Sequence, residues 1–208
     1  ANDVATKETA LMNSFAWFCG QNVEAGLVED IFAILDESPL SWDGESLGSV
    51  PLVSASYNHC EALIKILVDK DQSSLRSMDK LNRTPLAAYF WNFSPGSVKE
   101  DGSHNILDTF DLLDINRAFV CKPLSLLHAG YDPGHADTDF LDPSSDTLVS
   151  VTPLIVALVF RDLKMVEYLL SRGADVNAGA DGVTAAMWAV KTNATELIDA
   201  ILRSEEHT

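Results

Sequence analysis

Residues 152–178 read TPLIVALVFRDLKMVEYLLSRGADVNA, a sequence that predicts two short helices followed by a turn. Thr152 can cap the first helix with its hydroxyl, and Pro153 suits the first helical position because its missing N–H would have no partner there. Gly173 tolerates the left-handed backbone that ends many helices. The Asp and Asn within residues 175–177 favour a turn. The segment is thus one candidate repeat unit with which the rest of the chain can be compared.

Related helix starts recur along the chain, at Thr9, Val50, Thr84, Thr152 and Thr184. The intervals between them are 41, 34, 68 and 32 residues. An apolar pair lies 17 and 18 residues after three of these starts, as Leu67-Val68, Leu169-Leu170 and Ile201-Leu202. In the first copy the corresponding pair, Ile34-Leu35, comes eight residues late, which indicates an insertion near residues 20–26. We therefore predict five copies of one helix–turn–helix unit.

The pattern of T-P-L, a second helix ending in L-L and then G-A-D-V-N resembles the ankyrin repeat. The resemblance implies an all-α fold, a solenoid of stacked helix–turn–helix units that forms a single domain over residues 1–208. The repeats would span about 8–48, 49–82, 83–150, 151–182 and 183–204. The tetratricopeptide repeat has a similar period, but its aromatic and glycine spacing is absent here.

The 68-residue interval after Thr84 has two interpretations. It could hold a hidden extra repeat, or one repeat with insertions at 94–118 and 137–150. We prefer the second, because residues 126–133 (LLHAGYDP) resemble the end of one outer helix and no second start precedes them. Apolar residues in the first insertion, Ile106, Leu107, Phe110, Leu112, Leu113 and Ile115, predict an additional helix. The acidic, turn-rich second insertion predicts a loop.

The composition restricts the classes of partner. The chain has 14 Lys and Arg against 31 Asp and Glu, which gives a net charge of −17 and a pI of about 4.4. This charge argues against binding to nucleic acid or to an anionic membrane surface, and it is compatible with a basic protein or peptide partner or simply with solubility. Apolar residues make up 47% of the chain, enough for a sizeable core. The most apolar windows are too short to span a bilayer.

Three widely spaced cysteines, Cys19, Cys60 and Cys121, predict no disulfide framework and favour a reducing compartment. The first residues lack the apolar run of a signal peptide. We therefore expect the protein in the cytoplasm or nucleus, or in the host cytosol if it is a secreted bacterial effector. We also expect a monomer.

Motifs for catalysis and cofactor binding are missing from the sequence. It has no glycine-rich nucleotide motif, no G-x-S-x-G elbow and no H-E-x-x-H zinc motif. His59 and Cys60 adjoin at a helix junction, but no second ligand pair stands at zinc spacing. Three further histidines flank the insertions: His104, His128 and His135. The aspartates between residues 132 and 146 lack the glycine and glutamate of a calcium loop. We expect no metal, no cofactor and no enzymatic activity.

The resemblance also implies a binding surface. In ankyrin repeats the inner helices line a concave face, with exposed positions seven and eight residues after each starting threonine. The candidate partner-binding residues are Trp17, Tyr57, Asn58, Trp91, Asn92, Val159, Phe160 and Lys191. Four of the five repeats carry an aromatic residue there, and exposed apolar stripes usually mark contact sites. The alternative is that the insertions cover these rings, Trp91 first, since Phe93 follows it directly.

The function that the resemblance implies is a non-catalytic module that binds a protein or peptide through its concave face and the turns beside it. Two alternatives stay open. The repeats could form a targeting or regulatory domain of a larger enzyme or bacterial effector, or they could act alone as an enzyme inhibitor.

Overall fold

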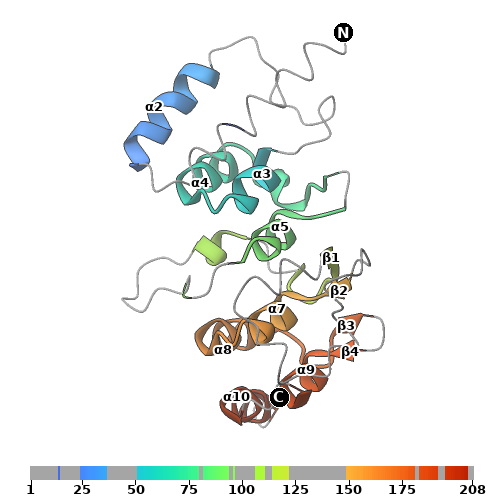
Figure 1. Cartoon of the computed structure of the whole chain (residues 1–208). Coiled ribbons are helices and arrows are strands. Elements are labelled where there is room, and N and C mark those ends of the chain that lie inside the picture. Colours follow the sequence, from blue (N-terminus) through green and yellow to red (C-terminus); the bar gives the residue numbers. More distant parts are fainter. Residues whose placement is uncertain are drawn as a thin grey trace. The chain divides into compact units, whose positions relative to one another are not determined.

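The chain divides into two compact units in the computed structural model shown in Figure 1. The structure describes residue 14 and residues 24–36, 51–79, 82–93, 96, 106–110, 114–121, 149–180, 183–191 and 195–205. The first unit comprises residues 1–92 and 106–111, and the second comprises residues 93–105 and 112–208. The single domain expected over residues 1–208 stays a prediction.

The first unit is helical over its described residues. Its elements are α2 (Ala25–Asp36), α3 (Pro51–Tyr57), α4 (Glu61–Lys70), the 3₁₀ helix η1 (Gln72–Arg76), α5 (Pro85–Trp91) and the 3₁₀ helix η2 (Ile106–Thr109). Helix α3 packs against both α4 and α5, and α4 packs against α2 and η2. Helices α3 and α4 therefore form one helix–turn–helix pair, and α5 begins the next.

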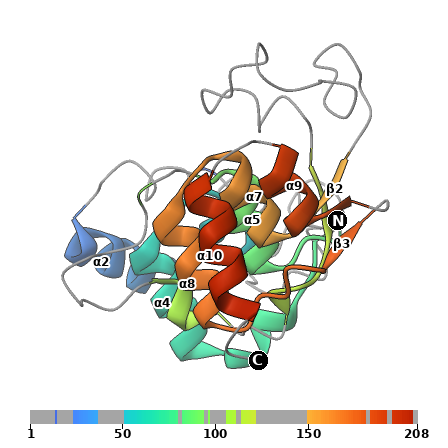
Figure 2. The same cartoon turned by 90° about the horizontal axis from the view of Figure 1, so that it is seen from below.

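Within its described residues, the second unit contains two such pairs and two short antiparallel strand pairs. Its elements are β1 (Phe119–Cys121), β2 (Val149–Val151), α7 (Pro153–Val159), α8 (Leu163–Ser171), β3 (Gly179–Ala180), β4 (Val183–Thr184), α9 (Ala185–Lys191) and α10 (Thr195–Glu205). Helix α7 packs against α8 and α9, and α10 packs against α8 and α9. Figure 2 shows α7 and α9 on the side of the hairpins, with α8 and α10 on the other side. The hairpins therefore flank the inner helices.

Threonine caps fix where three inner helices begin. The hydroxyl oxygens accept hydrogen bonds from backbone N–H groups three residues on: Thr84 from Ala87 at 3.2 Å, Thr152 from Ile155 at 3.3 Å, and Thr184 from Met187 at 3.2 Å. Each bond satisfies a donor that the first helical turn would otherwise leave unpaired. The predicted starts of α5, α7 and α9 are confirmed, and α3 begins at Pro51, directly after the predicted Val50.

The turns within the helix pairs also repeat. His59 and Arg161 both adopt a left-handed backbone, with φ of 54° at each, nine residues after the respective helix start. In each turn the following N–H donates 3.0 Å back to the inner helix, from Cys60 to the Ala55 carbonyl and from Asp162 to the Ala157 carbonyl. Two sequences with little identity in the turn therefore close their helix pairs by the same backbone geometry.

The core of each pair lies between its two helices. Leu63 and Ile64 of α4 are completely buried, as are Met165 and Leu169 of α8. Burying a leucine side chain stabilises a fold by about 1.5–3 kcal/mol. The predicted core position is confirmed for Leu169, whereas its neighbour Leu170 is only half-buried.

The described part of the first insertion forms less helix than we expected. Its apolar residues Ile106, Leu107 and Phe110 are buried, but only Ile106 and Leu107 lie in a helix, the four-residue 3₁₀ helix η2, which Phe110 follows directly. One helical turn suffices to bring these three side chains inward, where η2 packs against α4. The additional α-helix expected for residues 94–118 is therefore reduced to this turn within the described residues.

The second insertion also needs a correction at its end. Residues 149–151 form β2 and pair with β1 in antiparallel register, Phe119 opposite Val151 and Cys121 opposite Val149. The predicted loop at 137–150 therefore ends by residue 148, because the backbone of Val149 and Ser150 hydrogen-bonds in this ladder. Residues 126–133, which we assigned to an outer-helix end, lie outside the described residues. The all-α fold of helix–turn–helix repeats is confirmed, with strand confined to these short hairpins among the described residues.

Candidate functional site

Two aromatic residues end successive inner helices in the first unit. Tyr57 is the last residue of α3 and Trp91 the last residue of α5, and these two helices pack against each other. Both rings lie near one cation: the guanidinium carbon of Arg83 is 5.8 Å from the Tyr57 ring centroid and 4.9 Å from the Trp91 ring centroid. A guanidinium within about 6 Å of a ring centroid is attracted to the ring. Tyr57, Arg83 and Trp91, together with Asp79, form what we call the aromatic–arginine cluster.

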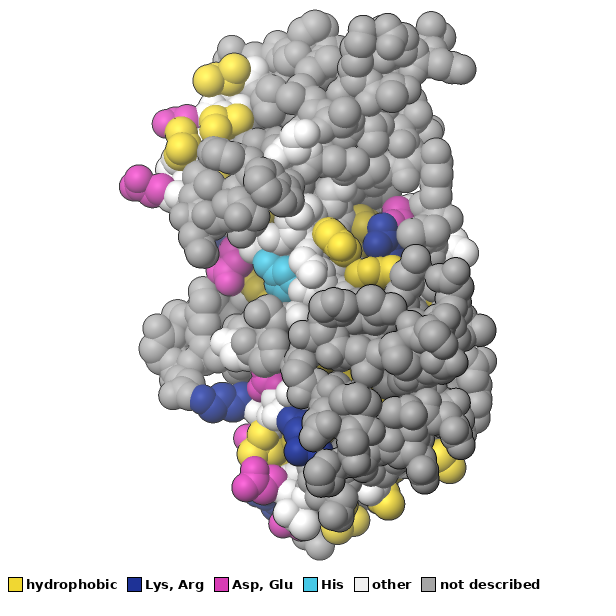
Figure 3. All heavy atoms as spheres, viewed as in Figure 1, with side chains coloured by type: hydrophobic (Ala, Val, Ile, Leu, Met, Phe, Trp, Pro, Cys, Tyr) yellow, Lys and Arg dark blue, Asp and Glu magenta, His cyan; other side chains and the backbone are white. Residues whose placement is uncertain are grey.

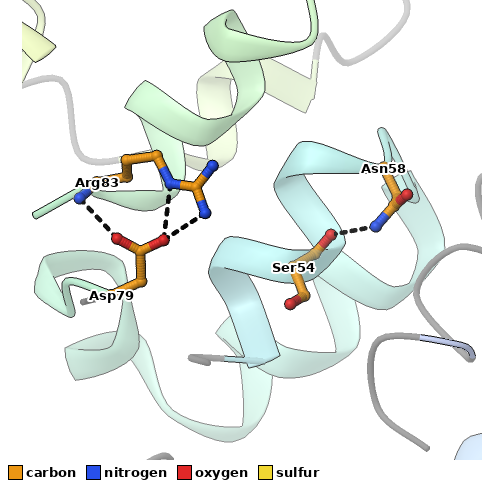
Figure 4. Close-up of polar contacts among 4 residues, drawn as sticks. All are labelled: Ser54, Asn58, Asp79 and Arg83. Atoms are coloured by element: carbon orange, nitrogen blue, oxygen red, sulfur yellow. Dashed lines mark hydrogen bonds and ion pairs between the residues drawn. The ribbon is translucent and has the colours of Figure 1, made fainter. Parts of the chain in front are cut away.

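Asp79 holds the guanidinium in place from the turn before α5. Its carboxylate accepts from the Arg83 side chain at Nε (2.7 Å) and from the Arg83 backbone N–H (2.9 Å), and Figure 4 shows these contacts. The Asp79 side chain is 6% exposed and that of Arg83 19% exposed. The guanidinium contacts one carboxylate oxygen and the backbone N–H of Arg83 donates to the other, and such charge-assisted hydrogen bonds are strong. The aromatic–arginine cluster is therefore rigid on its polar side.

A second set of contacts ties the ends of α3 and α5 together. The Asn92 side-chain amide donates to the Tyr57 carbonyl at 2.9 Å, and His59 Nε2 donates to the Asn92 carbonyl at 2.5 Å. The His59 ring also lies against Tyr89, with 4.3 Å between the ring centroids. Burial lowers the pKa of His59, and the hydrogen bond to the Asn92 carbonyl and the charge of Glu61 partly oppose this shift. Tyr57 and Asn92 are thus linked to each other as well as to the helices that carry them.

The predicted site residues of the first unit differ in how much of each side chain is exposed. Tyr57 is 36% exposed and Asn92 is exposed, whereas Trp91 is half-buried beside Arg83. Asn58 is half-buried, and its amide donates to the Ser54 carbonyl at 2.8 Å (Figure 4). In Figure 3, hydrophobic side chains lie next to basic and acidic ones near the ends of α3 and α5. Tyr57 offers most of the aromatic surface here, and Trp91 supports it.

In the second unit the predicted pair is more enclosed. Val159 is 3% exposed, so its side chain offers almost no surface to a partner, and we no longer count it among the candidate contacts. It is buried because α7 packs on both α8 and α9. Phe160 is half-buried, with its ring edge-on to Phe93 at 5.1 Å between centroids. Phe93 precedes the insertion at 94–118, so the alternative that the insertions cover the aromatic rings stays a prediction.

The two remaining site predictions fall where the structure gives no side chain. Trp17 lies outside the described residues, and Lys191 is the last residue of α9, with its side chain outside the described part. The candidate site residues predicted from the sequence did not include Asp79 and Arg83. The four-residue spacing of Asp79 and Arg83 across a turn was the signal that could have indicated their pairing.

Metal sites and membrane-spanning helices are both absent from the residues that the structure describes. Among them, no group of three or more His, Cys, Asp or Glu side chains is arranged to hold a metal ion. His104, His128, His135 and the aspartates between 132 and 146 lie outside the described residues. No helix in the described ranges combines the length and the apolar composition needed to cross a membrane.

Comparison with known proteins agrees with this repeat geometry. Residues 118–208 match the family model of ankyrin repeats in three copies. Over 92 residues the chain is 33% identical to a fowlpox virus protein (strain NVSL) named for its ankyrin repeats. That alignment covers 43% of this chain and 15% of the viral protein, so the chain spans only a small part of its relative. The capped inner helices, the paired outer helices and the hairpins beside them within residues 118–208 therefore agree with the ankyrin repeats that this part of the chain matches.

Proposed function

We propose that this chain binds a protein or peptide, without catalysis, through the inner-helix face that carries the aromatic–arginine cluster. Ankyrin repeats are generally protein–protein interaction modules and generally non-catalytic. The observation that carries the proposal is the convergence of Tyr57 and Trp91 on Arg83. Asn58 and Asn92 lie at the ends of the same helices as this cluster, and Trp17, Phe160 and Lys191 remain proposed contacts of their own repeats.

The cluster has the physical properties of a binding hot spot. A partner gains most from large side chains that are already ordered, because little rotamer entropy is then lost on binding. Arg83 is fixed by Asp79, and the end of α3 is fixed by Asn92. The exposed part of the Tyr57 ring is therefore presented in one position, with hydrogen-bonding groups beside it.

The partner that fits best is basic. The chain carries a net charge of −17, which attracts cations over a distance of about one Debye length. Within the cluster, Arg83 is already paired with Asp79, so a cation of the partner would find the open face of Tyr57 rather than a bare carboxylate. We propose that the protein works as a monomer in the cytoplasm or nucleus, or in a host cytosol.

A second candidate function, a domain within a larger protein, is supported by the length of the viral relative. The chain aligns with only 15% of the fowlpox virus protein, so related repeats occur within a much longer polypeptide. The repeats would then serve as the targeting or regulatory domain of a larger enzyme or effector. A stand-alone enzyme inhibitor is the third possibility, and it would use the same face.

The test is a selection followed by matched variants. Peptides would be selected from a random phage-displayed library against the immobilised chain, and the affinity of the best peptide would be measured by fluorescence anisotropy. Tyr57→Ala and Trp91→Ala are expected to weaken binding at least about tenfold, the equivalent of 1.4 kcal/mol. The selected peptides are expected to be rich in Lys and Arg.

Tyr168→Ala is the matched control. Tyr168 lies on the outer helix α8 and carries the same kind of contact, with the Arg172 guanidinium carbon 5.8 Å from its ring centroid. Removing this ring should leave peptide affinity unchanged. If Tyr168→Ala weakens binding as much as Tyr57→Ala does, while both variants stay folded, the inner-helix face is not the binding surface.

A further inference from the structure

The Arg83 guanidinium has more hydrogen-bond donors than its contacts with the described residues use. Its Nε and Nη2 groups both face one carboxylate oxygen of Asp79, Oδ2. The other terminal nitrogen, Nη1, has no acceptor among the residues that the structure describes, and Figure 4 shows it pointing away from Asp79. The Arg83 side chain is 19% exposed. The described residues thus leave this edge of the guanidinium open to a further acceptor.

The two aromatic rings hold this open edge in one orientation. The guanidinium carbon lies 4.9 Å from the Trp91 ring centroid and 5.8 Å from the Tyr57 ring centroid. Asp79 fixes the edge that carries Nε. A planar guanidinium that is already positioned loses little entropy for each hydrogen bond it forms. An acceptor that reaches Nη1 therefore meets a preformed donor close to the partly exposed Tyr57 ring.

Charge favours a neutral acceptor at Nη1. The Asp79 carboxylate already offsets the charge of Arg83, and the chain as a whole carries a net charge of −17. Both would repel a second carboxylate, whereas neither repels a carbonyl oxygen. A backbone carbonyl is available at every residue of an extended peptide, but in a helix it is used internally. An extended segment of a partner therefore supplies the acceptor that fits best.

Asn92 offers a complementary group at the ends of the same helices. Its Nδ2 donates to the Tyr57 carbonyl at 2.9 Å, and its Oδ1 has no donor among the described residues. Asn92 is exposed. Both Arg83 and Asn92 thus contact Tyr57, the first at its ring and the second at its carbonyl. One donor and one acceptor left open in this way match the C=O and N–H of a peptide backbone.

We propose that Arg83 is a specificity-determining residue whose Nη1 donates to a backbone carbonyl of an extended, basic peptide segment that lies across Tyr57. Asn92 Oδ1 accepts a backbone N–H of the same segment. This inference rests on the proposed function, because it names what the partner offers at the aromatic–arginine cluster. Arg83 recognises the backbone of the partner, while the negative charge of the chain attracts the basic side chains of the partner.

The test is a double-mutant cycle between Arg83 and the backbone of the best phage-selected peptide. Each peptide bond would be replaced in turn by an ester, which weakens the carbonyl as an acceptor and removes the N–H. Arg83→Lys keeps the positive charge beside Asp79 but loses the planar fork, so it should bind the all-amide peptide about tenfold more weakly. One ester should weaken binding to the wild type about tenfold and binding to Arg83→Lys less than about threefold. Fluorescence anisotropy would measure each affinity.

Arg172→Lys is the matched control. Arg172 directly follows the outer helix α8, and its guanidinium carbon lies 5.8 Å from the Tyr168 ring centroid. This substitution should leave peptide affinity unchanged. Circular dichroism would establish that each variant is folded, and Arg83→Gln is a second variant that should show the same loss of coupling to the ester.

The outcomes separate this inference from the proposed function. If Tyr57→Ala weakens binding but Arg83→Lys binds like the wild type, the inference is overturned and the proposed function stands. The inference is also overturned if every ester affects both proteins equally, or if the effect of Arg83→Lys depends on an Asp or Glu side chain of the peptide. If Tyr57→Ala does not weaken binding, both fail.

Discussion

His59 is a half-buried histidine that connects two successive repeats by its Nε2 bond to the Asn92 carbonyl. Burial lowers its pKa below the ordinary value of 6.5, so the unfolded chain takes up a proton more readily than the folded one. The neutral, buried His59 therefore makes its full contribution to the free energy of unfolding above pH 6.5. This contribution is lost as the pH falls through the lowered pKa of His59. We expect the unfolding free energy of the wild type to fall more steeply below pH 6.5 than that of His59→Asn.

Asparagine suits this test because it tolerates the left-handed backbone that His59 adopts, with φ of 54°. Urea unfolding at several pH values between about 8 and 5 would compare the two proteins. Carboxylates titrate in both, so the difference between the two curves isolates the histidine. Parallel curves over this range would show that His59 does not couple folding to protonation.

Single residues differ in how well the sequence predicts their role. The capping threonines were predictable, because a cap depends only on the three residues that follow it. The burial of Val159 was not, since it depends on α8 and α9 packing around α7. Arg83 was also missed as a site residue, because its position over Tyr57 and Trp91 requires α3 and α5 to stack.

Inner helix α7 depends on its cap at Thr152, which is almost completely buried. Loss of the hydroxyl leaves the Ile155 N–H without this acceptor in a place that water does not reach easily. We expect Thr152→Ala to lower the free energy of unfolding by about 0.5–2 kcal/mol. Thr152→Ser keeps the hydroxyl, so its free energy of unfolding should stay close to that of the wild type. Chemical denaturation of the three proteins would measure this. A serine variant as unstable as the alanine variant would indicate that the methyl group, rather than the cap, matters.

Outer helix α8 is held to the second unit by Leu169, which is completely buried. Leu169→Ala removes apolar contacts and leaves a cavity, so we expect a loss of about 2–5 kcal/mol in the free energy of unfolding. Leu170→Ala should cost clearly less, because Leu170 is half-buried. The two variants measured side by side by denaturant unfolding check the register of the helix. An equal loss for both would contradict it.

At the level of elements, the helices were predictable and the insertions were not. A helix pair is specified by contacts three and four residues apart, so the spacing of T-P-L and L-L sufficed for α7 to α10. The pairing of β1 with β2 joins segments separated by residues 122–148. A pattern of neighbouring residues cannot predict which distant segment a strand pairs with. The 3₁₀ turn η2 likewise depends on α4, against which it packs.

The fold class and the net charge are properties of the whole chain, and both can be read from the sequence. The resemblance to ankyrin repeats and the all-α fold followed from the repeat pattern. The exposure of the predicted site residues needed the structure, because the aromatic residues predicted at one offset differ in exposure from repeat to repeat. Tyr57 is partly open, Trp91 is supported by Arg83 and Phe160 lies against Phe93.

The net charge of −17 predicts how a basic partner would associate. Attraction between opposite charges speeds the encounter, and added salt screens it beyond about 10 Å at 0.1 M. For a Lys/Arg-rich peptide selected on this chain, we expect the association rate to fall about tenfold between about 0.05 and 0.5 M NaCl. The dissociation rate should change much less, because it depends on close contacts such as those of Tyr57. Stopped-flow fluorescence would measure both rates, with a Gln-substituted version of the peptide as the control. If salt changed the association of both peptides equally, charge would not guide the encounter, whereas an effect confined to the basic peptide would tie partner choice to the acidic composition of the chain.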